Sequence, residues 1–433
     1  MHDFLRYSIS AIAAIICFAA LSDELSPERK RLLVASFEEV WTTVRDKHYD
    51  PTLGGLDWQG VYNQFKPRID SASSEEEGRN IMNEMLGLLK QTHIGVIPAL
   101  AYSDMQSSDG SADSHKPGGY TPGIYVRVLN GQAIVFRVEA NYPAAKAGVA
   151  PGWEILKVNG RTVDSIIKRI EEHYSSSTIK DLMASRAIES LINGHSSEPV
   201  EVEFNDGRNA KKLKLERVEP KGDKIAFGNM PSNYFWVETS ATKDDIRVIK
   251  FNMWLNPEAV VKAFSEIMTD TERAKGFIID LRGNPGGIGG MAMGAAGWFT
   301  NQRGLKLGTM FMRGATINFV VSPRPNATSA PLAVLVDGCS ASTSEIFAGG
   351  MQDLKRARVF GTHTAGAALP SAFSRLPNGD GFQYVLANYI SEGGKPLEGL
   401  GLAPDEIVGI TQKELLAGKD PIMDKAIAWI KAQ

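Results

Sequence analysis

The segment PLAVLVDGCSASTSEIFAGGMQD, residues 331–353, has a pattern of apolar and small residues that indicates the fold of the surrounding chain. Its apolar run at 332–336 has the length and composition of a buried strand. Small residues follow at 338–341, and apolar residues then recur at the spacing of one helix face. The segment therefore predicts a buried strand, a tight turn and a helix.

Ser342 lies where the predicted turn meets the predicted helix, and the string from Ser342 to Glu345 has the S-x-x-E form of a capping box. Free backbone amides at a helix start stabilise developing negative charge, so this position suits a nucleophile. The alternative is that Ser342 only caps the helix, and this segment alone does not decide between the two. Cys339 is interpreted as a small buried residue of the turn.

The composition is that of a globular protein. A length of 433 residues is enough for about two or three domains. The formal net charge is −3, and no long block of one sign occurs, so nothing indicates a nucleic-acid partner. With 43% hydrophobic and 22% charged residues, the chain can bury an ordinary core.

The N-terminus has the pattern of a secretory signal peptide. An uncharged apolar run at 9–21 follows Arg6, and small residues stand near its end. The run is shorter than the ~20 residues that span a bilayer, so residues 1–22 are predicted to be a signal peptide and the protein to be secreted or periplasmic. An uncleaved N-terminal membrane anchor is the alternative. Removal of the signal leaves Cys339 as the only cysteine, so no intrachain disulfide is expected.

Residues 23–112 are predicted to form an N-terminal helical region followed by a linker. Apolar residues in 37–44 and 81–89 recur at helical spacing. The string QTHIGV then leaves the helix, and His93 stands at this exit. A lone histidine at a helix end is more often a partner of the helix terminus than a catalyst, so position alone does not assign it a function.

Residues 113–218 are predicted to form a separate β-rich domain, because short strands there alternate with Gly and Pro. The string YPAAKAGVAPGWEILKVNGRTV, residues 142–163, resembles the central part of a PDZ domain, with Trp153 in place of the usual Asp. That resemblance implies a domain that binds a C-terminal peptide by strand addition. The alternative is a small β-domain without a peptide partner. The expected carboxylate-binding loop comprises Thr121, Pro122, Gly123 and Ile124.

Residues 219–433 are predicted to form an α/β core, because strands alternate with helices after Pro220. A buried strand at 276–282 runs into the glycine-rich turn at 283–287. This turn lacks the lysine and the spacing of phosphate-binding loops, so nucleotide binding is not expected. Its glycines would instead let backbone amides approach a substrate closely.

Three motifs occur in a characteristic order: FIIDLRGNPGG, VLVDGCSASTSEIFAGGMQDLKRARVFG and PLEGLGLAPDEIV. Together they resemble the carboxyl-terminal processing peptidases and tricorn-like proteases of peptidase family S41. The resemblance covers nearly the whole mature chain. It implies a crotonase/ClpP-like α/β core with an N-terminal helical region and an inserted PDZ domain.

The family resemblance also implies the catalytic residues. The best-known branch uses a Ser-Lys dyad; its serine matches Ser342, but its lysine position is occupied here by Ala367. The tricorn-like branch uses Ser-His-Glu, which implies Ser342 as nucleophile, His93 as base and Glu398 as the carboxylate that orients the base. A serine needs such a base, and the imidazole needs such a carboxylate. Asp405 and Glu406 are alternatives for the carboxylate.

The oxyanion hole of such an enzyme would combine the backbone N–H of Thr343 with that of Gly286 or Gly287. The sequence does not decide between the two glycines. No metal site or organic cofactor is expected, because the histidines show no H-E-x-x-H pattern and cysteine is almost absent.

The leading hypothesis is therefore a secreted or periplasmic serine endopeptidase of the tail-processing type. It would cut unfolded or C-terminally exposed protein segments through an acyl-enzyme, with the PDZ domain binding or gating the substrate tail. A second hypothesis is a catalytically silent relative that binds a peptide or an apolar ligand, since the missing lysine would also mark such a protein. The oligomeric state is left open, a homo-oligomer included.

Overall fold

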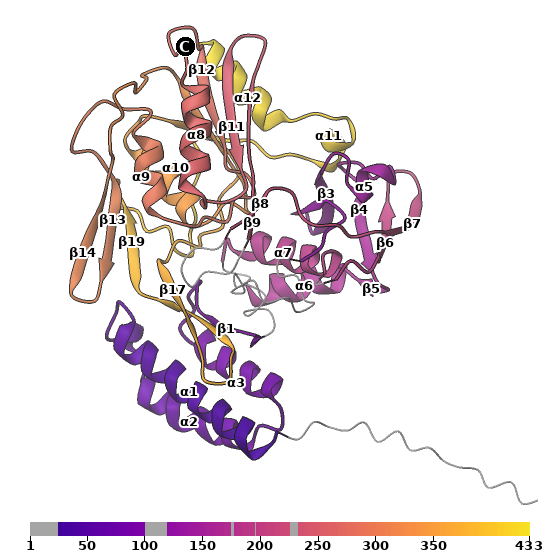
Figure 1. Ribbon diagram of the computed structural model, residues 1–433, viewed down its shortest axis with the longest axis vertical. Coiled ribbons are helices and arrows are strands. Elements are labelled where there is room, and N and C mark those ends of the chain that lie inside the picture. Colours follow the sequence, from indigo (N-terminus) through magenta and orange to yellow (C-terminus); the bar gives the residue numbers. More distant parts are fainter. Residues whose placement is uncertain (1–24, 100–118, 175–176, 195, 226–232) are drawn as a thin grey trace, which may run out of the picture.

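The computed structural model describes residues 25–99, 119–174, 177–194, 196–225 and 233–433. The predicted signal peptide and nearly all of the predicted linker lie outside the described residues. Figure 1 shows three parts: an N-terminal helical region below an α/β core, and an inserted β-domain formed by residues 119–218 to the side of them. Among the described residues, no helix is long and apolar enough to span a membrane.

The N-terminal helical region is built on apolar helix faces that pack together around Phe37 and Phe65. The indole N–H groups of Trp41 and Trp58 each donate to the other residue's carbonyl oxygen, at 2.9 and 3.0 Å. These contacts fix the first two helices against each other. The helices are α1 (Pro27–Lys47), α2 (Trp58–Ser71) and α3 (Glu75–Gly87).

A small sheet attaches the helical region to the core. After α3 the chain enters strand β1 (Gly95–Ile97), which pairs antiparallel with β18 (Gly381–Val385), and β17 (Ser371–Arg375) completes this sheet. The register pairs Gly95 with Gln383. The segment just before β1 is therefore held close to the C-terminal part of the core.

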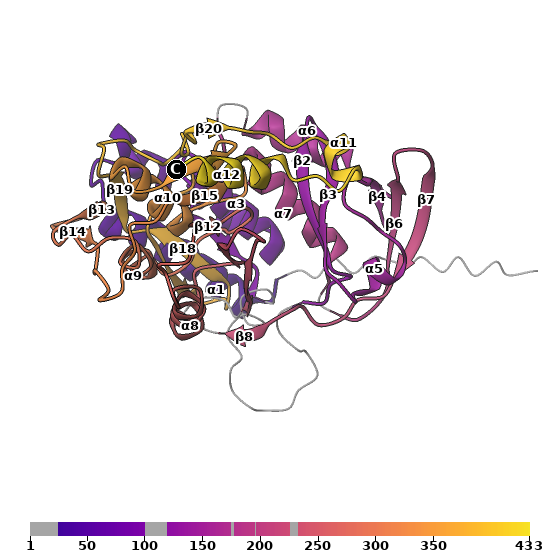
Figure 2. The ribbon, with the colours of Figure 1, turned by 90° about the horizontal axis from the view of Figure 1, so that it is seen from above.

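The inserted β-domain is a five-stranded antiparallel path in the order β2-β3-β4-β6-β7, so β2 is an edge strand. Alternate residues of β2 are buried, as a half-buried strand requires. Helix α7 packs along β2, and α6 packs on α7 (Figure 2). The elements are β2 (Ile124–Leu129), β3 (Gln132–Val138), α5 (Pro143–Lys146), β4 (Glu154–Val158), β5 (Arg161–Thr162), α6 (Asp164–His173), α7 (Lys180–Ile192), β6 (Val200–Asn205) and β7 (Ala210–Leu215).

The core is a six-stranded sheet in the order β10-β11-β12-β15-β16-β20, parallel except for β10. Every residue of β12 and β15 is buried, as expected for central parallel strands covered on both faces. Helices α8, α9 and α10 cover one face, and α12 covers the other. The elements are β10 (Val237–Ala241), β11 (Ile246–Phe251), α8 (Pro257–Ile267), β12 (Gly276–Asp280), α9 (Gly290–Ala296), β15 (Leu332–Val336), α10 (Thr343–Asp353), β16 (Arg358–Gly361), β20 (Glu406–Ile407) and α12 (Pro421–Lys431).

The remaining elements lie around this sheet. A second three-stranded sheet, β14-β13-β19, packs next to α10. The elements not yet given bounds are η1 (Leu53–Gly55), β8 (Asp223–Ile225), β9 (Asn233–Phe235), β13 (Lys306–Met312), β14 (Ala315–Val320), β19 (Ala387–Ser391) and α11 (Gln412–Leu416).

The strand, turn and helix predicted from residues 331–353 are present as β15, the turn at 337–342 and α10. The last strand of the inserted β-domain, Ala210–Leu215, ends three residues before Val218. Val218 instead pairs with Thr121 in an isolated bridge, because the chain has by then turned away from β6.

Candidate active site

Ser342 occupies a strained turn between the carboxyl end of β15 and the start of α10. Its backbone has φ 55° and ψ −118°, and a positive φ is unusual for a residue with a side chain. Such strain costs about 1–3 kcal/mol and persists only where the surroundings impose it. The predicted capping box forms, with the Ser342 N–H donating to the Glu345 carboxylate at 2.8 Å. The turn therefore fixes the serine at a helix N-terminus.

Glu345 is more than the cap that the sequence predicts. It is fully buried, and besides the Ser342 N–H it accepts from the Thr364 hydroxyl at 2.5 Å. It also accepts from the backbone N–H groups of Gly366 and Ala367, at 2.8 and 3.0 Å. Burial raises the pKa of the Glu345 carboxyl to about 7 in spite of these four donors. One carboxylate thus holds the serine and the segment that contains Ala367 together.

The glycine-rich loop after β12 lies directly against the serine. A Cβ atom added to Gly286 would come within 2.6 Å of the Ser342 Cβ, so no side chain fits there. The carbonyl oxygen of Asn284 accepts from the Ala341 N–H and the Ser344 hydroxyl, both at 3.0 Å. The Thr343 hydroxyl donates to the Gly287 carbonyl oxygen at 2.9 Å. These bonds fasten the loop to the first turn of α10.

Two backbone amides remain available beside Ser342. The Gly286 N–H already donates to the Asn284 side chain at 3.0 Å. For the N–H groups of Thr343 and Gly287, the described part of the chain supplies no acceptor. Of the two glycines that the sequence left open, Gly287 is therefore the better candidate for the oxyanion hole with Thr343.

His93 lies in the loop just before β1, with φ 57°. Its Nδ1 atom is 2.8 Å from the hydroxyl oxygen of Thr92. Burial lowers the pKa of the imidazole from 6.5 to about 4, so the ring is neutral at physiological pH. A neutral imidazole can accept a proton, which a general base must do.

In the described part of the chain, Glu398 is connected to His93 through Thr92. Its carboxylate accepts from the Thr92 N–H at 2.8 Å and from the Thr92 hydroxyl at 3.0 Å. It also accepts from the Ala368 N–H at 3.0 Å, and burial raises its pKa. The direct Glu398–His93 pair that the resemblance implied is therefore replaced by a chain in which the Thr92 hydroxyl stands between the two. Sequence reasoning missed Thr92, although it directly precedes the histidine.

The two alternative carboxylates are engaged elsewhere. Asp405 accepts from the Val359 N–H at 2.8 Å, and Glu406 pairs with Arg358. Neither bonds to Thr92 or His93 in the described part of the chain. Among the described residues no hydrogen bond joins His93 to Ser342, although Glu398 and Glu345 accept from the adjacent backbone N–H groups of Ala368 and Ala367.

The inserted β-domain reaches this region through Arg127 of β2. Arg127 Nε donates to Asp337 at 2.7 Å, at the end of β15. The other oxygen of Asp337 accepts from the N–H groups of Gly283 and Cys339, at 2.9 and 3.0 Å. Burial alone would raise the pKa of Asp337, but Arg127 and these bonds hold it below its usual range. One ion pair thus connects the β-domain with both the glycine-rich loop and the serine turn.

Residues 121–123 of the predicted carboxylate-binding loop precede β2, and the backbone N–H groups of Thr121 and Gly123 are already bonded within the domain. Thr121 exchanges backbone hydrogen bonds with Val218, and its hydroxyl accepts from the Gly123 N–H at 3.0 Å. Pro122 has no N–H to offer a carboxylate. Ile124 begins β2 and pairs with Val138 of β3.

We predict that the acid limb of the pH–rate profile lies well below neutrality. Because burial disfavours the charged imidazolium, His93 stays neutral as the pH falls until its pKa of about 4 is reached. The rate constant for reaction of Ser342 with a fluorophosphonate, measured from pH 3.5 to 9, should therefore be level above about pH 5.5 and fall around pH 4. A limb centred near 6.5 would contradict this environment for His93. The Ser342 N–H donates to Oε2 of Glu345, whereas Thr364 bonds to Oε1, so a proton taken up by Oε1 should leave the bond to Ser342 intact.

The sequence is similar to known protein families and to individual proteases. Residues 245–408 match peptidase family S41, and residues 35–87 match the tricorn protease C1 domain. A carboxy-terminal-processing protease of Bartonella bacilliformis is 26% identical over 366 residues, which are 82% of this chain and 75% of that protein.

Two solved structures share the fold. The photosystem II D1 C-terminal processing protease superposes with a TM-score of 0.59 at 19% identity, covering 90% of this chain and 94% of that one. Mature CPAF superposes with a TM-score of 0.62 at 13% identity, covering 93% of this chain and 97% of that one. These likenesses confirm the predicted mixed α/β fold with N-terminal helices.

Proposed function

We propose that this chain, a serine peptidase of family S41 similar to the carboxyl-terminal processing proteases, cleaves unfolded or C-terminally exposed protein segments by a Ser-His-Glu mechanism. The observation that carries the proposal is the chain of contacts from Glu398 through Thr92 to His93 in the region of Ser342. The position of the Ser-Lys branch lysine holds Ala367, whose backbone N–H is bonded to Glu345. Imidazole is therefore the base that this arrangement offers.

In this mechanism His93 takes the proton of the Ser342 hydroxyl while the serine oxygen attacks the substrate carbonyl carbon. The N–H groups of Thr343 and Gly287 donate to the carbonyl oxygen as it becomes negative. His93 then gives its proton to the leaving amine, and the acyl-enzyme remains. A water molecule, deprotonated by His93, then attacks the ester carbon. His93 returns that proton to the Ser342 oxygen as the ester bond breaks, which releases the new carboxyl end. His93 must come within hydrogen-bond reach of Ser342 during this cycle, since the contact is not made in the structure.

Thr92 acts as a positioning residue in this proposal. Its hydroxyl can accept the Nδ1–H of His93 and donate its own proton to Glu398, which selects the tautomer with a free Nε2. Thr92→Val preserves shape but removes both bonds. Bonds to charged groups are worth about 1.5–3 kcal/mol, so kcat should fall about 10- to 100-fold. Kinetics on a peptide substrate would check this.

The matched control is Thr92→Ser, which keeps the hydroxyl and should retain kcat within about threefold of the wild type. KM should change little in either variant, because Thr92 does not face the substrate in this scheme. A valine variant with wild-type kcat would show that Glu398 does not act through Thr92.

The proposal also assigns the substrate tail to the inserted β-domain, interpreted as a PDZ domain. The edge position of β2 beside α7 supports this, because a peptide can add only to a strand with a free edge. Export through the predicted signal peptide would give the enzyme access to secreted or periplasmic proteins.

Labelling with a fluorophosphonate probe tests the function. The mature wild-type protein should be labelled at Ser342, as located by mass spectrometry of the modified peptide. The second candidate, a silent binding protein, is favoured by one observation: His93 and Ser342 make no hydrogen bond. Absence of labelling in folded protein would favour that candidate and refute the peptidase.

A further inference from the structure

The unpaired edge of β2 is partly occupied by a side chain of the same domain. The backbone N–H of Val126 points away from β3 and donates to Oε1 of Glu189 at 2.9 Å. Glu189 belongs to α7, the helix that packs along β2. Its side chain is 13% exposed, so this carboxylate lies largely inside the domain.

This contact closes the place where a peptide strand would add. A peptide on β2 must offer a carbonyl oxygen to an edge N–H, because main-chain hydrogen bonds supply the affinity of strand addition. The Val126 N–H is such a group, two residues beyond the predicted carboxylate-binding loop. Glu189 supplies a charged oxygen in the place of that carbonyl, and hydrogen bonds to charged acceptors are stronger than neutral ones.

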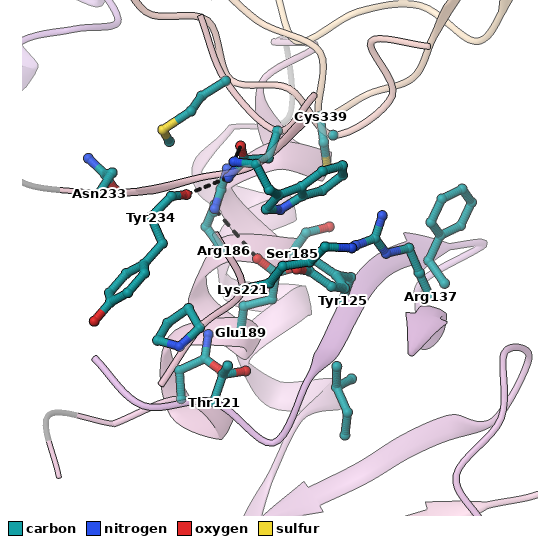
Figure 3. Close-up of a pocket in the computed structure, with 18 of the residues that line it drawn as sticks. Thr121, Tyr125, Arg137, Ser185, Arg186, Glu189, Lys221, Asn233, Tyr234 and Cys339 are labelled. Carbon is teal, nitrogen blue, oxygen red and sulfur yellow. Dashed lines mark hydrogen bonds and ion pairs between the residues drawn. The ribbon is translucent and has the colours of Figure 1, made fainter. Parts of the chain in front are cut away.

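The surroundings show a space into which a peptide could enter. A cavity of about 250 Å³ lies between β2, α7 and the facing residues of the core (Figure 3). Its walls include Thr121 and Tyr125 from the β-domain, Ser185 and Glu189 from α7, and Trp236 and Cys339 from the core. The cavity therefore runs from the carboxylate-binding loop to the turn that carries Ser342.

Glu189 has a second partner at hand. Arg186, one turn earlier on α7, places its Nη1 atom 3.6 Å from Oε2 of Glu189, and its side chain is 50% exposed. Figure 3 shows this pair at the cavity wall. A rotation of Glu189 away from Val126 would leave its charge paired with Arg186 at the surface. Rotation of Glu189 thus frees the Val126 N–H without isolating a buried charge. The Val126 carbonyl oxygen accepts from Nη1 of Arg127 at 2.8 Å and keeps a second lone pair for a peptide N–H.

We propose that Glu189 is a built-in competitor of the substrate tail: it closes the β2 edge in the resting protein, and a tail with a free C-terminal carboxylate binds by displacing it from Val126. The occupant is the C-terminal strand of an unfolded protein substrate. This inference rests on the proposed tail-binding role of the inserted β-domain and adds that the site is self-inhibited.

The test measures tail binding separately from catalysis. Full-length mature protein carrying Ser342→Ala binds a fluorescein-labelled decapeptide pool with three randomised apolar residues at its free C-terminus, and fluorescence anisotropy gives the apparent Kd. Adding Glu189→Ala should lower the Kd about tenfold, because the peptide no longer has to displace Glu189 from Val126. A tenfold change in Kd corresponds to about 1.4 kcal/mol of binding free energy. The matched control is Glu172→Ala, an exposed glutamate on α6, which should leave the Kd unchanged.

A second readout addresses the edge itself. Hydrogen exchange of the peptic fragment that contains β2 should become faster in the Glu189→Ala protein. The free-carboxylate pool should restore its protection, whereas the same pool with amidated C-termini should not. Unchanged or weaker binding by the Glu189→Ala protein, or no binding by either protein, would overturn the proposal. Fluorophosphonate labelling of protein with Ser342 intact is measured independently, so failure of tail binding is distinguished from failure of the peptidase.

Discussion

Replacing Ser342 with alanine is expected to lower peptide hydrolysis by about 10⁶-fold, to the level of a protein without a nucleophile. The hydroxyl is the group that forms the acyl-enzyme in our proposal. Its backbone is held by Glu345, whose carboxylate accepts the Ser342 N–H in either variant. The substitution should therefore remove the chemistry while the turn keeps its shape. Hydrolysis of a fluorogenic peptide, with thermal unfolding as a check of folding, measures this.

The matched control is Cys339→Ala, which removes the thiol of the same turn and leaves the Ser342 hydroxyl in place. Cys339 is buried, and burial raises the pKa of its thiol to about 12, so the reactive thiolate is almost absent at neutral pH. Its loss should leave hydrolysis within about twofold of the wild type. A Ser342→Ala protein that still hydrolyses the peptide at an appreciable rate would place the nucleophile elsewhere.

Replacing His93 with alanine is expected to cost about 10⁴- to 10⁶-fold in kcat, with folding preserved. In our proposal the serine hydroxyl then loses its base, and the position of the alternative lysine is Ala367. Thr92 and Glu398 would keep their mutual bonds and continue to hold the loop to the core. The measurement is kcat at pH 7, where a histidine with a pKa near 4 is neutral.

The control for this variant is His363→Ala. His363 is an exposed histidine next to the segment that Glu345 holds, so it tests whether any imidazole near the site suffices. Its replacement should leave kcat unchanged. The account would be contradicted by a His93→Ala protein with near wild-type kcat, or by a large loss in His363→Ala.

Much of the fold follows from local patterns in the sequence. The apolar run of β15, the small-residue turn and the periodic face of α10 each have a local cause, and all three are present. The order of the three motifs indicated family S41, which the comparisons support. Motif order also pointed to Ser342 and the glycine-rich loop, which the fold brings within contact of each other.

The features that could not be predicted from the sequence depend on contacts between segments that are distant in the chain. Thr92 and Glu398 are 306 residues apart, and a hydroxyl beside a histidine leaves no periodic signal. The several bonds of Glu345 follow from the return of the segment around Ala367 to the head of α10. The capture of the Val126 N–H by Glu189 depends on the packing of α7 on β2. The catalytic roles, the domain boundaries and the export of the protein stay predictions.

The central claim is that imidazole, and not an amine, activates Ser342. A crystal structure of the fluorophosphonate adduct tests it most directly, because the probe traps the serine in its reacted geometry. We predict that Nε2 of His93 lies about 3 Å from the Ser342 oxygen, directly or through one water, with the phosphonyl oxygen bonded to the N–H groups of Thr343 and Gly287. An adduct on Ser342 with His93 still remote, and a lysine amine in its place, would contradict the account.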